Sequence, residues 1–170
     1  MTPALPTLTT TPVPYAGCCL ALSHPLLQHL SSLLSPPPRL ALSIGSGYGL
    51  LEALLLALNA NIAGVEVAPS SNTYLPEANH RLVHGSRFLD PIAADAHLWM
   101  FVYPRRAGLV KEYLDEYGHG RVERIIWAGP RADWQEYVSC FDQWQCTVRG
   151  ADEVGGRAWE LIAVADRLSL

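Results

Sequence analysis

A glycine-rich segment and one carboxylate are the residues of this sequence best suited to bind a ligand. The run Ser43-Ile44-Gly45-Ser46-Gly47-Tyr48-Gly49 joins an apolar stretch to a leucine-rich one. Glycines there allow a tight turn with positive φ and close approach of a ligand to the backbone, and the start of a helix offers free N–H groups. Farther along, Glu66 carries two oxygens that can accept hydrogen bonds from two neighbouring hydroxyl groups. Together they predict a small-molecule site.

The six histidines do not form a metal-binding pattern. None has metal-ligand spacing with carboxylates or thiols, so we expect no metal ion. His84 and His97, near predicted strand ends, are the better candidates for a catalytic base, although a structural role is favoured for both.

The cysteines and the N-terminal stretch indicate a reducing compartment. Cys18, Cys19, Cys140 and Cys146 have neither zinc-finger nor redox spacing, which predicts free or buried thiols. The first charged residue is Arg39, so the beginning of the chain lacks the basic region of a secretory signal, and polar residues interrupt its apolar stretch. We expect a cytoplasmic protein that does not associate with membranes.

Composition favours one globular domain. The chain has 170 residues, of which 49% are hydrophobic and 16% charged, with a net charge of −4. Basic residues are scattered apart from Arg105 and Arg106, which argues against a nucleic-acid partner. A small molecule or a protein is the expected partner.

Patterns along the chain predict an α/β domain over residues 23–170, after an N-terminal arm at 1–22 that is flexible or laid on the surface. Ser23 is a helix cap for a leucine stripe that the prolines at 36–38 stop. Apolar runs predict strands at 39–44, 61–67, 80–85, 96–103 and 122–127, helices at 49–60, 106–117 and 133–143, and a closing antiparallel hairpin at 145–149 and 158–165.

This alternation predicts a mostly parallel sheet covered on both faces, with ligands at the carboxyl edge of its strands. Pro69 and Pro76 leave room for at most about a turn of helix between the second and third strands. The middle helices are therefore expected to be shortened.

The glycine spacing resembles a known family. A GxGxxG dinucleotide fingerprint is disfavoured by Leu50 and Leu51, whereas GxGxG resembles motif I of the class I, Rossmann-like S-adenosylmethionine-dependent methyltransferases. Gly64-Val65-Glu66-Val67 resembles their second motif, and 159–165 their last, antiparallel strand. The segment from Gly64 to His80 also resembles small fungal methyltransferase-like proteins.

The resemblance implies S-adenosylmethionine as the cofactor, with Glu66 holding its ribose hydroxyls and Tyr103 and Arg105 on the substrate side. The implied cofactor-binding residues are Ser43, Gly45, Ser46, Gly47, Gly49, Glu66, Val67, Gly85 and Ser86.

Two carboxylates that this family usually carries are missing. Ser43 stands where motif I has an acid, and Gly85 and Ser86 stand where an acid holds the adenine amino group, unless Asp90 substitutes. A serine hydroxyl contributes less to binding an amino or cationic group than a carboxylate does. Weakened or lost cofactor binding is therefore the alternative expectation.

The expected activity is methylation of a small, aromatic or acidic molecule. Methyl transfer needs mainly positioning, so no catalytic residue is predicted. The alternative is a methyltransferase-like domain without methylation that serves as a binding or scaffold subunit, or as a cofactor-independent isomerase or cyclase. In either case a homodimer partner or the N-terminal arm could supply a lid.

Overall fold

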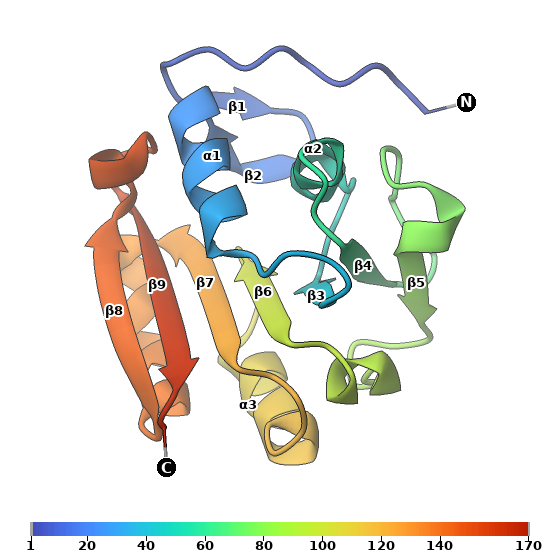
Figure 1. Cartoon of the computed structure of the whole chain (residues 1–170), viewed down its shortest axis with the longest axis vertical. Coiled ribbons are helices and arrows are strands. Elements are labelled where there is room, and N and C mark those ends of the chain that lie inside the picture. The colour runs from blue at the N-terminus through green and yellow to red at the C-terminus, as the bar shows by residue number, and fades with distance from the viewer. Residues whose placement is uncertain (1, 170) are drawn as a thin grey trace.

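A seven-stranded sheet forms the centre of the computed structural model, which describes residues 2–169 (Figure 1). Its strand order is β5-β4-β3-β6-β7-β9-β8. The strands are β3 (Ala41–Ile44), β4 (Ile62–Val67), β5 (His80–Val83), β6 (Leu98–Val102), β7 (Arg124–Pro130), β8 (Trp144–Gly150) and β9 (Glu160–Arg167). The first five in this order are parallel, and β9 is antiparallel to both β7 and β8. The predicted α/β sheet with a C-terminal antiparallel hairpin is confirmed.

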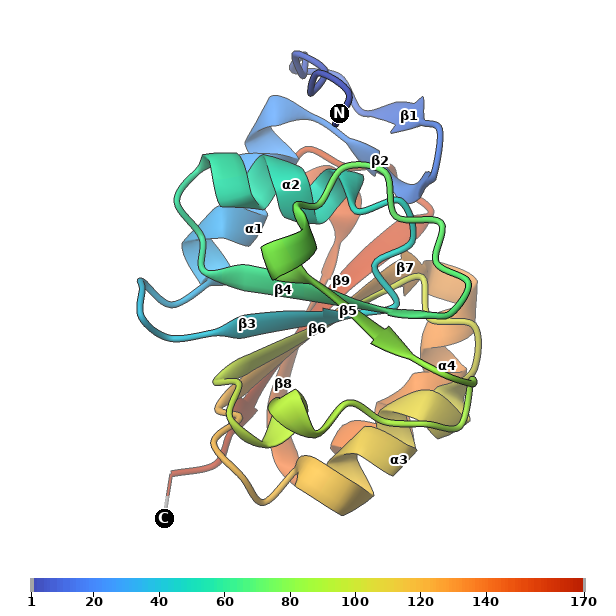
Figure 2. The ribbon, with the colours of Figure 1, turned by 90° about the vertical axis from the view of Figure 1, so that its right-hand side faces the viewer.

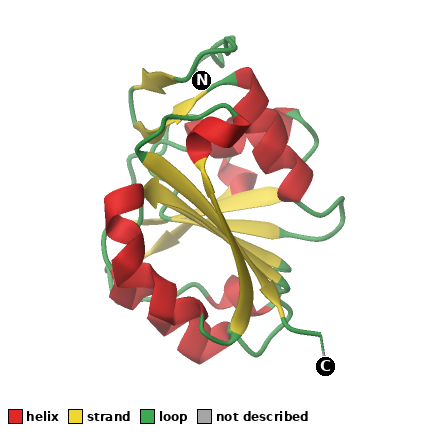
Figure 3. Cartoon of the chain, turned by 90° about the vertical axis from the view of Figure 1, so that its left-hand side faces the viewer, coloured by secondary structure: helices red, strands yellow, loops and turns green. Residues whose placement is uncertain are grey.

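Helices cover both faces of the sheet, which makes three layers (Figures 2 and 3). One face carries α1 (His24–Leu33) and α2 (Leu50–Ala57), and the other carries α3 (Ala107–Tyr117) and α4 (Trp134–Tyr137). Successive residues of a strand point to opposite faces. Along β6, Leu98 and Met100 accordingly pack under α1 and α2, whereas Trp99 and Phe101 pack under α3 and α4.

The lead-in helix follows its sequence signals. Ser23 Oγ accepts from the Leu26 amide at 3.1 Å and donates to the Gly155 carbonyl at 2.7 Å. Leu26 and Leu30 are fully buried. The cap and the apolar stripe thus fix α1 against the sheet, as predicted.

The predicted helix at 133–143 is shorter than expected. Only Trp134–Tyr137 is α-helical, and Val138–Phe141 continues as a 3-10 turn. The change begins at Val138-Ser139-Cys140, residues with weak helix propensity. Its aromatic face forms nevertheless, because Trp134 and Tyr137 pack on Trp127 with ring centroids 5.1 and 5.2 Å apart.

The middle crossovers are abbreviated, as the prolines predicted. Between β4 and β5 the only helical element among the described residues is the 3-10 turn Glu77–Asn79, and between β5 and β6 it is Pro91–Ala94. Neither crossover therefore places an α-helix against a face of the sheet.

The end of the N-terminal segment forms a hairpin that the sequence analysis did not predict. β1 (Val13–Tyr15) pairs with β2 (Cys18–Leu22), and Leu20 and Leu22 are fully buried in the core under α1 and α2. The boundary at residue 22 stays a prediction. In the part of the chain that is described, no helix combines the length and apolarity needed to cross a membrane.

Candidate functional site

The turn after β3 depends on its glycines. Gly45, Gly47 and Gly49 have φ values of +84, +57 and +78°, in the left-handed region that other residues rarely adopt. A Cβ on Gly49 would also lie 2.7 Å from Asn72 Oδ1 and 2.9 Å from Leu75 Cγ. A Cβ on Gly45 would meet nothing within 4 Å. The turn is therefore tight on the side facing the protein and open at Gly45.

The amides of Ser46 and of the three glycines in the turn are hydrogen-bonded within the protein, which corrects the expectation that these amides face a ligand. Gly45 N and Ser46 N donate to the Val65 carbonyl at 2.9 and 3.1 Å. Gly49 N donates to the Ser46 carbonyl at 2.9 Å. These three glycines therefore offer a ligand close approach rather than hydrogen bonds.

Glu66 points at the turn. Its Oε2 accepts from Gly47 N at 2.8 Å, and its Oε1 accepts from Val67 N at 2.8 Å. Each carboxylate oxygen accepts more than one hydrogen bond, so both retain capacity for ligand hydroxyls. The acid at the end of β4 is thus fixed beside the β3 turn, as the resemblance implied.

A cleft of about 920 Å³ lies at this edge of the sheet. Its walls come from the turn, the ends of β4 and β6, the loop after β5, and the N-terminal hairpin. Of the residues predicted from sequence, it brings together Gly45, Ser46, Gly47, Glu66, Val67, Ser86, Tyr103 and Arg105. Ser43, Gly49 and Gly85 are not among its lining residues.

Asp90 is not placed to substitute for the acid that the resemblance assigns to the adenine amino group. Its Oδ2 and Oδ1 accept from Arg81 at 2.6 and 3.0 Å, and Oδ1 also accepts from Ile92 N. It is 3% exposed and is not among the cleft-lining residues. Phe88, which is 64% exposed, lines this end of the cleft instead. This end of the cleft therefore presents an apolar ring on which a planar group can stack.

Glu52 is a cleft residue that the sequence analysis missed. It lies on α2, is 3% exposed, and its Oε1 accepts from Ser43 Oγ at 2.6 Å. Burial, opposed by the hydrogen bond from Ser43, raises the pKa of Glu52 to about 7. The available signal was that Glu52 is the one charged residue in the apolar stretch 49–60.

The N-terminal hairpin forms part of the cleft wall through Tyr15, Gly17, Cys18 and Cys19. Gly17 lies against the ring of Tyr48, since a Cβ there would be 2.1 Å from two ring carbons. Burial raises the pKa of Cys18 to about 12, with the nearby charge of Glu52 adding to the effect. The Cys18 thiol therefore stays protonated and is a wall residue rather than a base or nucleophile.

Tyr103 is held in an unusual conformation at the end of β6. Its φ of +49° is rare for a bulky residue, and its hydroxyl donates to Glu160 Oε2 at the start of β9. Burial and this hydrogen bond raise the pKa of Tyr103. Glu160 is 1% exposed and was also missed, because the pair is formed between residues far apart in sequence. Tyr103 is thus a fixed, protonated hydroxyl in the cleft wall.

The histidines lie away from this cleft. Neither His84 nor His97 is among the lining residues, and His97 precedes β6 at the opposite, amino edge of the sheet. The proposal of either as a base is therefore not supported by position. Within residues 2–169, no group of three or more histidine, cysteine, aspartate or glutamate side chains could hold a metal ion.

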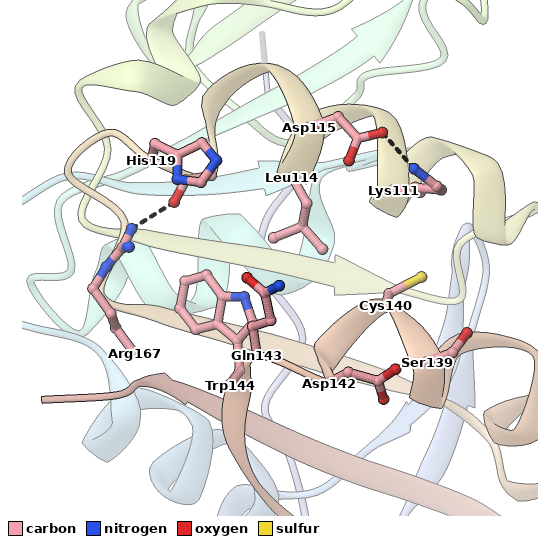
Figure 4. A pocket seen from close by; sticks show the side chains of 11 residues that line it. Lys111, Leu114, Asp115, His119, Ser139, Cys140, Asp142, Gln143, Trp144 and Arg167 are labelled. Atoms are coloured by element: carbon pink, nitrogen blue, oxygen red, sulfur yellow. Dashed lines mark hydrogen bonds and ion pairs between the residues drawn. The ribbon is translucent and has the colours of Figure 1, made fainter. Parts of the chain in front are cut away.

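A second cavity, of about 490 Å³, lies between the end of α3 and the start of β8 (Figure 4). Three of its charged groups already have partners: Lys111 contacts Asp115, and Arg167 donates to the Gly118 carbonyl at 2.6 Å. The Arg167 guanidinium also stacks 5.0 Å from the ring centroid of Trp144. It lies at the amino edge of the parallel strands, away from the glycine turn.

Comparisons with known proteins show what the fold is similar to. No family model matches the sequence, and no curated protein matches it. Among solved structures, a precorrin-6Y C5,15-methyltransferase from Geobacter metallireducens is 13% identical with a TM-score of 0.66, covering 95% of this chain and 100% of that one.

Two further solved structures of methyltransferases are similar to this chain in fold. A tRNA methyltransferase from Aquifex aeolicus is 12% identical with a TM-score of 0.61, covering 88% of this chain and 70% of that one. A predicted O-methyltransferase from Agrobacterium tumefaciens is 13% identical with a TM-score of 0.55, covering 85% and 81%. The chain therefore has the class I, Rossmann-like methyltransferase fold, as the sequence resemblance predicted. The likeness to fungal proteins stays a prediction.

Proposed function

We propose that this chain binds S-adenosylmethionine in the cleft at the glycine turn and transfers its methyl group to a small molecule. The observation that carries the proposal is the position of Glu66. Its carboxylate accepts a hydrogen bond from Gly47 N at 2.8 Å and lines the cleft. A carboxylate fixed beside a backbone bend can hold two vicinal hydroxyls of a sugar.

The residues present fit this cofactor. The cleft volume, about 920 Å³, lies in the range of small-molecule sites. Its two carboxylates, Glu52 and Glu66, take part in none of the six ion pairs among the described residues, and a cationic ligand would compensate them. Phe88 supplies an apolar surface for a base.

The bound sulfonium supplies an electrophilic methyl group, and the protein's task is to orient it and the acceptor. Glu66 would hold the sugar. Tyr103, whose hydroxyl donates to Glu160, would face the methyl acceptor and could accept a hydrogen bond from it. Arg105 is exposed, lines the cleft and belongs to none of the ion pairs in the described part of the chain, which favours an acidic acceptor.

A small acceptor is supported by the cover over the cleft. The hairpin turn at Gly17 lies against Tyr48, so part of the space above the glycine turn is filled by the chain itself. The net charge of −4 also disfavours a nucleic-acid acceptor. A homodimer and a cytoplasmic location remain predictions.

The test is calorimetric titration with S-adenosylhomocysteine. We expect saturable binding, weakened by about 10- to 100-fold in Glu66→Gln because a charge-assisted hydrogen bond is lost. Glu77→Gln, an exposed acid outside the cleft, is the matched control and should bind like the wild type. Equal affinity in Glu66→Gln and the wild type would contradict the proposed site.

The second candidate is a domain of this fold that has lost methylation and acts as a binding subunit, or as a cofactor-independent isomerase or cyclase. It is favoured by the engagement of Asp90 with Arg81, which leaves the adenine end without a free carboxylate. Absence of any heat with millimolar S-adenosylhomocysteine would favour this candidate.

A further inference from the structure

Glu52 is a buried acid whose charge nothing nearby compensates. It is 3% exposed, receives a hydrogen bond from Ser43 Oγ at 2.6 Å, and belongs to none of the ion pairs among residues 2–169. The nearby charge of Glu66 opposes its ionisation further. A buried carboxylate without a partner costs stability, so its presence in a cleft suggests a ligand that supplies the missing positive charge.

The order of the strands indicates which part of a bound nucleoside cofactor would reach Glu52. Along the carboxyl edge, Ser86 and Phe88 follow β5, Glu66 ends β4, the glycine turn follows β3, and Tyr103 follows β6. A nucleoside whose sugar is held by Glu66 and whose base lies toward Phe88 must extend its other end toward β3 and β6. Glu52 lines the cleft on that side, hydrogen-bonded to Ser43 of β3.

We propose that Glu52 binds the α-ammonium group of the cofactor's amino-acid part, supplying from α2 the carboxylate that β3 lacks at Ser43. This inference rests on the proposed function. Ser43 then positions Glu52, because the Ser43 hydroxyl on β3 donates to Glu52 Oε1 and thereby fixes the orientation of the carboxylate. The serine at 43 and the acid at 52 act as one unit in place of a single strand carboxylate.

The test compares two ligands that differ only beyond the sugar and sulfur. S-adenosylhomocysteine carries the amino-acid part, and 5′-methylthioadenosine has a methyl group in its place. Calorimetry with the wild type, Glu52→Gln and Glu66→Gln gives six affinities. Glutamine keeps the shape and an acceptor for Ser43 but removes the charge.

We expect Glu52→Gln to bind S-adenosylhomocysteine about 10- to 100-fold more weakly than the wild type and methylthioadenosine within about twofold. Glu66→Gln should lose affinity for both ligands. Equal affinity of Glu52→Gln and the wild type for S-adenosylhomocysteine would overturn the inference.

An equal loss for both ligands in Glu52→Gln would also overturn it, because it would assign Glu52 a structural role. Either result, with wild-type binding intact, leaves the proposed function standing. If the wild type binds neither ligand, the proposed function and this inference fail together. Circular dichroism of each variant checks that the fold is retained.

Discussion

The carboxylate of Glu66 accepts a hydrogen bond from the backbone amide of Gly47, with Oε2 2.8 Å from the nitrogen. A strand residue and a turn residue far apart in sequence are thereby fixed to each other before any ligand arrives. Preorganisation of this kind lowers the entropy that binding must offset. The same contact occupies the Gly47 amide, so at this point of the turn the Glu66 oxygens, and not the amide, are available to a ligand.

Substitutions at Gly45 and Gly49 should distinguish an effect on ligand affinity from an effect on the stability of the fold. For Gly45→Ala, the added Cβ meets nothing in the protein but lies in the cleft-lining turn, so we expect lost ligand affinity and only about 1 kcal/mol of destabilisation from the positive φ. For Gly49→Ala, contact with Asn72 and Leu75 adds to the same strain, and destabilisation should be about 2–4 kcal/mol. Denaturant unfolding and calorimetry measure both, and the reverse ranking in stability would refute this assignment.

Glu52 makes stability depend on pH. Its pKa in the folded state is raised to about 7, above the ordinary value of 4.5, so the folded state binds an additional proton between these values. Its contribution is fully present below pH about 4.5 and is lost as pH rises through about 7, with a slope of up to about 1.4 kcal/mol per pH unit.

The variant Glu52→Gln should lack this slope and be more stable than the wild type at pH 8. Urea unfolding of both proteins between pH 5 and 8 measures the difference, at about 25 °C. Parallel pH profiles for the two proteins would show that folding does not raise the pKa of Glu52.

Tyr103 and Glu160 should be energetically coupled. Tyr103→Phe removes the donor to a carboxylate that is 1% exposed and whose other oxygen has no partner among the described residues, so we expect about 1–3 kcal/mol of destabilisation. In a double-mutant cycle with Glu160→Gln, the two losses should be less than additive. Strict additivity would mean that the two side chains do not interact.

Gly17 should fix the hairpin over the site. A Cβ there would be 2.1 Å from the Tyr48 ring, so Gly17→Ala must displace the turn or the ring and weaken S-adenosylhomocysteine binding. The double variant Gly17→Ala/Tyr48→Ala removes the ring and should recover part of the thermal stability. Recovery should be incomplete, because the φ of +76° at position 17 still costs about 1 kcal/mol in alanine. No recovery in thermal denaturation would show that the contact is not what requires glycine.

The fold could be predicted because its signals are local. Apolar runs ending in glycine marked β3, and the cap at Ser23 and the prolines after position 35 marked α1. The turn and Glu66 followed from their spacing. α4 was too long in the prediction because a short aromatic face can form on one α-helical turn and a 3-10 turn.

The rest of the site depends on contacts between distant parts of the chain. Glu52 reaches the cleft only because α2 packs where Ser43 can donate to it, and Glu160 meets Tyr103 only because β9 is inserted antiparallel beside β7. The hairpin at 13–22 carries no strong alternation, and its place over the cleft depends on Gly17 and Tyr48. Such pairings have no sequence periodicity to reveal them.

The central claim is that the Glu66 carboxylate holds the sugar of a nucleoside cofactor beside the glycine turn. A crystal structure of the protein with S-adenosylhomocysteine tests it most directly. The account predicts ligand density in the cleft with both ribose hydroxyls within hydrogen-bonding distance of Glu66. Density in the cavity beside Arg167 and Trp144, or an empty cleft at saturating ligand, would contradict it.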